Sequence, residues 1–186
     1  MSKQASKNER LWTRKAIYVM TWEQVGDALE TLANRIAAIG FEPDALVPIA
    51  VGGLVPAAYF HHRYPTADVL PIRVRRTASH ALYSDKIPPE ITTWFTGGPD
   101  AIRDKRILIV DDVNGSGATL RSVRTFVQQA GARSAVACVL ASNTRSDDRE
   151  AYSAFEVDDW VVFPWESRSE TSQHRIRVLD LDAGAP

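Results

Sequence analysis

Two adjacent carboxylates, followed by a loop of small residues, are the feature of this sequence best suited to chemistry. Asp111 and Asp112 come directly after an apolar run, and residues 114–119 then read NGSGAT before a predicted helix. Backbone N–H groups in such a loop point at an anion, and the dipole of the helix adds to the attraction. The carboxylates can accept hydrogen bonds from sugar hydroxyls, or hold Mg²⁺ through oxygen and water. The pattern therefore predicts a site for a phosphorylated sugar.

This loop is distinct from two common phosphate-binding motifs. It lacks the lysine of a Walker A loop, and Leu120 stands where a dinucleotide fingerprint needs its third glycine. The alternative is a structural turn between a strand and a helix. Burying two carboxylates at the end of a strand costs free energy unless a ligand or a cation binds them, so we favour the binding site.

A second glycine loop, Val51-Gly52-Gly53, lies between a predicted strand at 45–50 and a predicted helix at 54–62. Ligands of parallel α/β sheets bind beyond the carboxyl ends of the strands, which is where both glycine loops fall. The two loops are therefore expected to face one site, although a plain turn between strand and helix would leave the same pattern.

Strands and helices alternate along the chain. Apolar residues recur at helical spacing after Thr21, and Gln24 completes a capping box three positions later. We expect further helices at 54–62 and 117–130, and strands at 16–20 (an edge strand), 45–50, 69–74, 106–110, 135–141 and 160–163. This alternation predicts a single α/β domain with a central, mostly parallel sheet flanked by helices.

Several stretches lack such periodicity. Residues 1–14 are predicted to form a disordered arm ahead of a domain that spans 15–186. Turn residues accumulate at about 75–105, which predicts a flexible loop that could close over the site. The polar residues 142–150 are predicted to form a loop in which Arg145, Asp147, Asp148 and Arg149 are solvated.

The composition argues against several classes of protein. The 186 residues carry a net charge of −1, which gives no reason to expect nucleic acid or membrane partners. No apolar run approaches the ~20 residues of a membrane-spanning helix, and the N-terminus lacks a signal-peptide core. The only cysteine, Cys138, cannot form an internal disulfide and is predicted to be buried and inert. We therefore expect a cytoplasmic location.

Four segments resemble type I phosphoribosyltransferases, and most of all the purine enzymes that act on xanthine, guanine and hypoxanthine. The segment VDDVNGSGAT at 110–119 is similar to the signature of that superfamily. The other three are TWEQVGDALETLANRI at 21–36, PDALVPIAVGGLVPAAYF at 43–60 and DDWVVFPWE at 158–166. The resemblance covers about residues 15–166, and it implies a small hood built from the N- and C-terminal segments, with a hood element at about 142–180.

The resemblance implies a substrate and a role for each motif. Asp111 and Asp112 would hold the ribose hydroxyls of phosphoribosyl pyrophosphate (PRPP) and Mg²⁺, the latter through water. Val51, Gly52 and Gly53 would form the pyrophosphate loop. The 5′-phosphate would be wrapped by Asn114, Gly115, Ser116, Gly117, Ala118 and Thr119.

The base and the assembly are also implied by the resemblance. Trp160 would stack on a purine and the Val161 backbone would read its edge, whereas a packed core tryptophan is the alternative. Trp165 and Glu166 are expected to be structural. The implied activity is transfer of the phosphoribosyl group from PRPP to a nitrogenous base, most often a purine, in a homodimer.

The sequence departs from the purine enzymes at three positions. Gly115 stands where those enzymes usually carry an acid that serves the purine N7 proton. Val51 replaces a charged or polar residue, and Ser142 replaces a lysine that reads the 6-oxo group. These departures leave two alternatives open: a binding protein for PRPP or a nucleotide that has lost catalysis, or a transferase with a pyrimidine or other acceptor.

Two arginines offer a further source of positive charge. Arg73 and Arg75 alternate along a predicted strand and should share one face. That face could contact pyrophosphate or an RNA, or it could simply be solvated.

Overall fold

The computed structural model describes residues 11–13, 15–77, 86–166 and 176–177. The first helix shows why this sequence folds as predicted. α1 (Trp22–Ala38) begins at the capping box, in which Gln24 N donates to Thr21 Oγ1 at 3.2 Å and Thr21 N donates to Gln24 Oε1 at 2.9 Å. Its apolar face packs against the sheet, as the helical spacing of its apolar residues requires.

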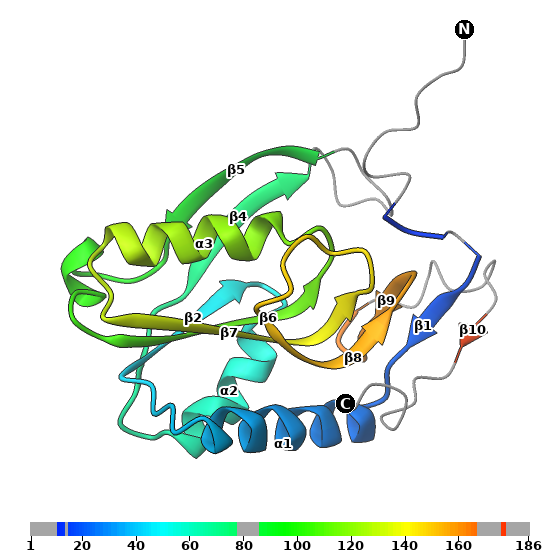
Figure 1. The fold of residues 1–186 in the computed structure, drawn as a ribbon, viewed down its shortest axis with the longest axis horizontal. Coiled ribbons are helices and arrows are strands. Elements are labelled where there is room, and N and C mark those ends of the chain that lie inside the picture. The colour runs from blue at the N-terminus through cyan, green and yellow to red at the C-terminus, as the bar shows by residue number, and fades with distance from the viewer. Residues whose placement is uncertain (1–10, 14, 78–85, 167–175, 178–186) are drawn as a thin grey trace, which may run out of the picture.

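Within the described residues, a seven-stranded sheet forms the centre of the molecule (Figure 1). The strand order is β5-β4-β2-β6-β7-β8, with β3 paired to β2, and every pair is parallel except β4 with β5. The strands are β2 (Ala45–Ala50), β3 (Asp68–Val69), β4 (Ile72–Thr77), β5 (Lys86–Thr93), β6 (Arg106–Asn114), β7 (Ser134–Asn143) and β8 (Tyr152–Val157). The predicted α/β domain with a mostly parallel sheet is confirmed.

Helices cover both faces of this sheet, which explains its long apolar strands. α1 and α2 (Leu54–Arg63) lie on one face and α3 (Ala118–Gln129) on the other (Figure 1). Alternate residues of β6 serve the two cores: Leu108 packs beneath α1 and α2, whereas Ile107 and Ile109 pack beneath α3. Cys138 is fully buried in the first core, and burial raises the pKa of its thiol, as expected of an inert cysteine.

A small parallel sheet of order β10-β1-β9 stands beside the carboxyl ends of the main strands (Figure 1). It joins β1 (Ile17–Val19), β9 (Trp160–Val162) and β10 (Ile176–Arg177), so it brings together segments from both ends of the chain. This sheet is the expected hood. β1 is its central strand rather than the edge strand we expected, because β9 and β10 pair with its two sides.

Three strands differ from the expectation. The strand predicted at 69–74 is divided into β3 and β4, because Pro71 lies between them and has no N–H to donate to the ladder. The predicted loop at 75–105 contains β5 and the short 3₁₀ helix Gly98–Ala101. β5 tolerates its two prolines because it is an edge strand. The tip of that predicted loop, 78–85, lies outside the described residues.

The remaining differences concern β6, β8 and the N-terminus. β6 runs through the acid pair to Asn114 instead of ending at residue 110, since its pairing with β7 continues that far. β8 was not predicted, and it belongs to the main sheet although we assigned 142–180 to the hood. Leu11 and Trp12, which we expected in a disordered arm, are buried, and Thr13 of that arm is half-buried; residues 1–10 and 14 lie outside the described residues. No helix within the described ranges could span a membrane.

Candidate active site

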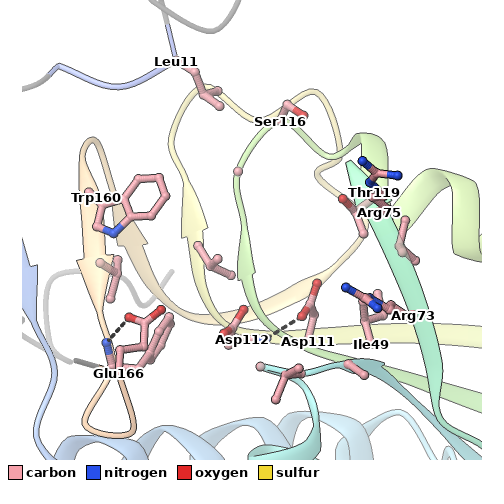
Figure 2. Close-up of a pocket in the computed structure, with 18 of the residues that line it drawn as sticks. Leu11, Ile49, Arg73, Arg75, Asp111, Asp112, Ser116, Thr119, Trp160 and Glu166 are labelled. Atoms are coloured by element: carbon pink, nitrogen blue, oxygen red, sulfur yellow. Dashed lines mark hydrogen bonds between the residues drawn. The ribbon is translucent and has the colours of Figure 1, made fainter. Parts of the chain in front are cut away.

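A cavity of about 840 Å³ opens where β2 and β6 end and the hood stands beside them. Both strands run in the same direction, so their carboxyl ends deliver the two predicted loops to one place (Figure 2). The predicted site residues that line the cavity are Val51, Gly52, Asp111, Asp112, Gly115, Ser116, Thr119, Trp160 and Val161. Gly53, Asn114, Gly117 and Ala118 do not line it.

The acid pair sits on the last part of β6. Asp111 is 8% exposed, and its Oδ1 accepts a hydrogen bond from Asp112 N at 3.0 Å. Burial raises the pKa of Asp111 well above its ordinary value, and repulsion from Asp112 adds to this. Burial and the negative charge of Glu166 raise the pKa of Asp112 to about 6. The pair is thus poised to gain from a hydrogen-bond donor or a cation.

Gly52 is placed directly against this pair. A Cβ atom at Gly52 would lie 1.8 Å from Asp112 Oδ2 and 2.3 Å from Asp112 Cγ. Only a glycine lets the 51–53 loop come this close to the carboxylate. The glycine loop and the acid pair therefore form a single wall of the cavity. Gly53 is buried behind this wall.

The donor set suits Mg²⁺, provided that a ligand supplies most of its oxygens. Magnesium is usually held in proteins by one or two carboxylates together with water and substrate phosphates. Asp111 and Asp112 offer such carboxylates, and a bound cation would offset the burial and charge repulsion that raise their pKa values. Across the described residues, no three His, Cys, Asp or Glu side chains converge as a complete metal site.

The loop after β6 leads into the N-terminus of α3. Ser116 and Thr119 line the cavity (Figure 2), and Gly117 adopts a φ of +79° that favours glycine. A Cβ at Gly117 would lie 2.5 Å from Asp148 Cβ, so the loop rests tightly on Asp148. This packing fixes the turn into α3, whose Thr119 lines the cavity, so the N-terminus of the helix would attract an anion there.

Asn114 supports this loop and does not reach the cavity. Its Nδ2 donates to Ser142 Oγ at 3.1 Å and to the Asp148 carbonyl at 3.0 Å, and its Oδ1 accepts from Ser146 Oγ at 3.2 Å. At 2% exposure, all of its side-chain polar atoms are used inside the protein. The side chain we assigned to phosphate binding is instead structural.

The segment that follows β7 is less solvated than we expected. Asp148 is 4% exposed and forms an ion pair with Arg124 of α3 at 2.9 Å. Arg145, Asp147 and Arg149 are exposed, as predicted. Asp148 therefore ties the 114–119 loop, α3 and the 144–150 segment together.

Positive charge reaches the cavity from β4. Arg73 and Arg75 both line it, and Figure 2 shows their side chains beside Asp111 and Thr119. Arg73 pairs in register with Ala50, the residue before Val51, so it stands next to the 51–53 loop. Val51 itself is 69% exposed and carries no charge. The two arginines lie on one face, as predicted, and that face borders the cavity.

The hood supplies the aromatic end of the cavity. Trp160 is half-buried and lines it, while Trp165 stacks on Phe163 with ring centroids 4.9 Å apart and planes within 6°. Glu166 Oε2 accepts a hydrogen bond from Phe163 N at 2.9 Å, which is the structural role expected of it. Glu166 also faces Asp112 across the cavity (Figure 2).

The lining residues that were not predicted from the sequence include Leu11, Trp12 and Glu166. Trp12 lies beside Trp160, with ring centroids 5.7 Å apart and planes tilted by 59°. The available signal was two adjacent large apolar residues in an otherwise polar N-terminal stretch.

Comparison with known proteins gives consistent results. Residues 21–170 match the family described as the phosphoribosyl transferase domain. The chain is 33% identical over 169 residues to the xanthine-guanine phosphoribosyltransferase of Cereibacter sphaeroides, a match that covers 85% of this chain and 91% of that protein. The crystal structure of a purine phosphoribosyltransferase from Pyrococcus horikoshii is 32% identical with a TM-score of 0.68, covering 82% of this chain and 95% of that one. The Helicobacter pylori xanthine-guanine-hypoxanthine phosphoribosyltransferase shares the fold at 18% identity, with a TM-score of 0.66 and coverage of 81% and 94%.

Proposed function

Because this chain belongs to the phosphoribosyltransferase family, we propose that it transfers the 5-phosphoribosyl group of PRPP to a purine base and releases pyrophosphate. One observation carries the proposal: the acid pair, both glycine loops and Trp160 border the same cavity. A ligand with a ribose, two phosphorylated ends and an adjoining base needs these groups in one place. The proteins named for purines at 33% and 32% identity support the choice of acceptor.

The chemistry is a displacement at the anomeric carbon of the ribose. Loss of pyrophosphate builds positive charge on the sugar ring, as in glycoside hydrolysis. Asp111 and Asp112 would accept hydrogen bonds from the ribose hydroxyls and hold the ring in line with the base. Ser116, Thr119 and the N–H groups at the start of α3 would bind the 5′-phosphate. Bound Mg²⁺, held by the acid pair and PRPP oxygens, would neutralise charge on the pyrophosphate.

We assign the leaving group to the 51–53 loop and to Arg73. Val51 and Gly52 bring the backbone of the loop to the cavity, while the Gly53 N–H donates to the Ile49 carbonyl. Arg73 stands one strand away at the register of Ala50. A guanidinium binds phosphate oxygens through paired hydrogen bonds and stabilises the charge that develops there. Arg73 would therefore supply the positive charge that Val51 lacks.

The base would lie against Trp160 in the hood. Aromatic stacking holds any base, and the aromatic walls at this end of the cavity favour a bicyclic purine over a smaller, more polar ring. The homodimer implied by the resemblance stays a prediction.

Pyrophosphate release tests the proposal. PRPP and Mg²⁺ would be supplied with hypoxanthine, guanine, xanthine, adenine, uracil or orotate in turn. We expect release that depends on the presence of a purine. Release with uracil or orotate alone would mean that the acceptor is a pyrimidine. If none of the six bases supported pyrophosphate release, the proposed transferase activity would be contradicted.

A second function has a specific observation in its favour. Gly115 carries no acid, and Val51 carries no charge at the entrance of the pyrophosphate loop, as expected of a protein that binds PRPP or a nucleotide without turnover. Saturable binding of PRPP without pyrophosphate release for any base would support it.

A further inference from the structure

The N-terminal segment, residues 11–13, is fastened on both sides of Trp12. On one side, Asn143 Nδ2 donates to the Leu11 carbonyl at 3.1 Å. On the other, Thr13 N donates to the Asp158 carbonyl at 3.1 Å, and Thr13 Oγ1 donates to Asp159 Oδ2 at 2.6 Å. The segment therefore bridges the end of β7 and the start of β9.

Asp159 anchors this arrangement beneath the hood. It is fully buried, and it accepts hydrogen bonds from the amides of Lys15 at 2.7 Å, Ala16 at 3.1 Å and Trp160 at 2.9 Å. Burial alone would raise its pKa, but the bonds from Thr13 and these amides lower it overall. The same carboxylate thus ties the N-terminal segment to the backbone of Trp160.

Trp12 fills the corner between the hood and residues 114–119, the loop that would bind the 5′-phosphate (the phosphate loop). It is 6% exposed and lines the cavity together with Trp160. A Cβ at Gly115 would lie 3.2 Å from Trp12 Cζ2 and 3.7 Å from Leu11 Cδ2. The indole therefore packs against position 115 so closely that even a Cβ there would need it to shift by a few tenths of an ångström.

The two indoles are too close to enclose a base between them. Stacking on both would require about 7 Å between their planes, twice the usual contact distance, whereas their centroids are 5.7 Å apart. Trp12 instead braces Trp160 from the side and closes the cavity beside it. The base would then meet an apolar wall at this corner.

We propose that Trp12 is a specificity-determining residue of the base site, which positions Trp160 and replaces the side chain of residue 115 as the wall beside the base. This inference rests on the proposed function. It makes selection of the base depend on shape and stacking at this corner, rather than on a charged group from the phosphate loop.

Substitution of Trp12 tests the proposal through the separate KM values of the two substrates. We expect Trp12→Ala to raise the KM for guanine about tenfold, because an aromatic pair and its buried area are lost, and to change the KM for PRPP less than twofold. Trp12→Phe should restore most of the loss. Trp94→Ala is the control, since Trp94 is 49% exposed and lies outside the cavity.

A coupled substitution tests the contact with position 115. Gly115→Val should raise the guanine KM about tenfold in the parent protein, because the new side chain displaces Trp12, but less than threefold in Trp12→Ala. Equal effects in both backgrounds would overturn the contact. Thermal unfolding of each variant would show whether the fold persists.

Binding of guanosine monophosphate, measured by calorimetry, needs no turnover. It therefore tests the role of Trp12 separately from the proposed transferase activity. If the parent protein releases pyrophosphate with a purine, and Trp12→Ala leaves both the guanine KM and the nucleotide Kd unchanged, the role of Trp12 is wrong and the proposed function stands. If the parent protein binds the nucleotide but releases no pyrophosphate with any base, the proposed function fails, and an unchanged nucleotide Kd in Trp12→Ala would overturn the role of Trp12 as well. If the parent protein neither binds the nucleotide nor releases pyrophosphate, both fail.

Discussion

In the proposed function, the cavity has a sugar-phosphate end, lined by Asp111, Asp112, Ser116 and Thr119, and a base end, lined by Trp12, Gly115 and Trp160. The first end comes from one continuous stretch of chain where a central strand passes into α3. The second joins three segments that are distant in sequence, two of them in or beside the small hood sheet. A continuous stretch can carry a recognisable signature, whereas an assembled corner leaves only scattered residues. The two ends should therefore respond differently to substitution.

The largest expected effect concerns the acid pair. Replacing both acids, Asp111→Asn with Asp112→Asn, should lower kcat/KM for PRPP about 10³-fold or more, because the preorganised charge near the ribose is removed. Pyrophosphate release measures it, and circular dichroism shows whether the fold is kept. Activity within tenfold of the parent protein would remove the acid pair from the mechanism.

Substitution of Gly52 tests whether the 51–53 loop and the acid pair act as one wall. Gly52→Ala forces the Asp112 carboxylate to move, since the new Cβ would lie 1.8 Å from Oδ2, and we expect turnover to fall about 10²-fold. The matched control is Gly26→Ala in α1, where a Cβ would meet nothing within 4 Å. That control should leave turnover unchanged and stabilise the fold by roughly 0.5–1 kcal/mol. Equal turnover in the two variants would break the link between Gly52 and Asp112.

Arg73 extends the sugar-phosphate end toward the leaving group. Arg73→Ala should raise the KM for PRPP about tenfold, since a charged hydrogen bond to phosphate is lost, and should spare the KM for guanine. Arg103→Ala serves as its control, because Arg103 pairs with Asp100 on the exposed surface. An unchanged KM for PRPP would show that β4 presents a merely solvated face.

Trp160→Ala is the counterpart at the base end. The KM for guanine should rise about tenfold through the loss of stacking, with the KM for PRPP changed less than twofold. The same assay measures both constants. A rise confined to PRPP would mean that we have assigned the two ends in reverse.

The smallest effect lies at the opposite end of β6 and concerns stability alone. Hydrogen bonds from Arg106 lower the pKa of Asp44 to about 2. Its ion pair therefore stabilises the fold above the ordinary pKa of 3.8, and this contribution is lost as the pH falls toward 2. The unfolding free energies of the parent protein and Asp44→Asn should differ slightly at pH 6 and converge below pH 3, as measured by urea unfolding. A gap that widens on acidification would contradict this.

The sequence predicted the sugar-phosphate end better than the base end. Both glycine loops and the acid pair follow apolar strands of a parallel sheet, so their meeting is a consequence of topology. Asn114 was misassigned because its type suits a phosphate as well as it suits the buried bonds to Ser142 and Asp148. Trp12 was missed because nothing local indicates that it packs against Trp160, 148 residues further along the chain.

In the fold, too, elements that follow from a local segment were predicted better than elements that depend on a distant partner. Helices α1 and α3 follow from periodicity and end signals within each segment. β5 and β8 depend on their partners, since both are edge strands that only the neighbouring β4 and β7 reveal. Prolines in β5 indicated a turn, yet an edge position removes the need for their missing N–H groups.

The stoichiometry of the reaction with PRPP, Mg²⁺ and guanine tests phosphoribosyl transfer at this site most directly. We predict one guanosine monophosphate for each pyrophosphate released by the parent protein, and neither product from the variant that lacks both acids. Release of pyrophosphate without a nucleotide product, or equal products from that variant, would contradict transfer of the phosphoribosyl group at this site.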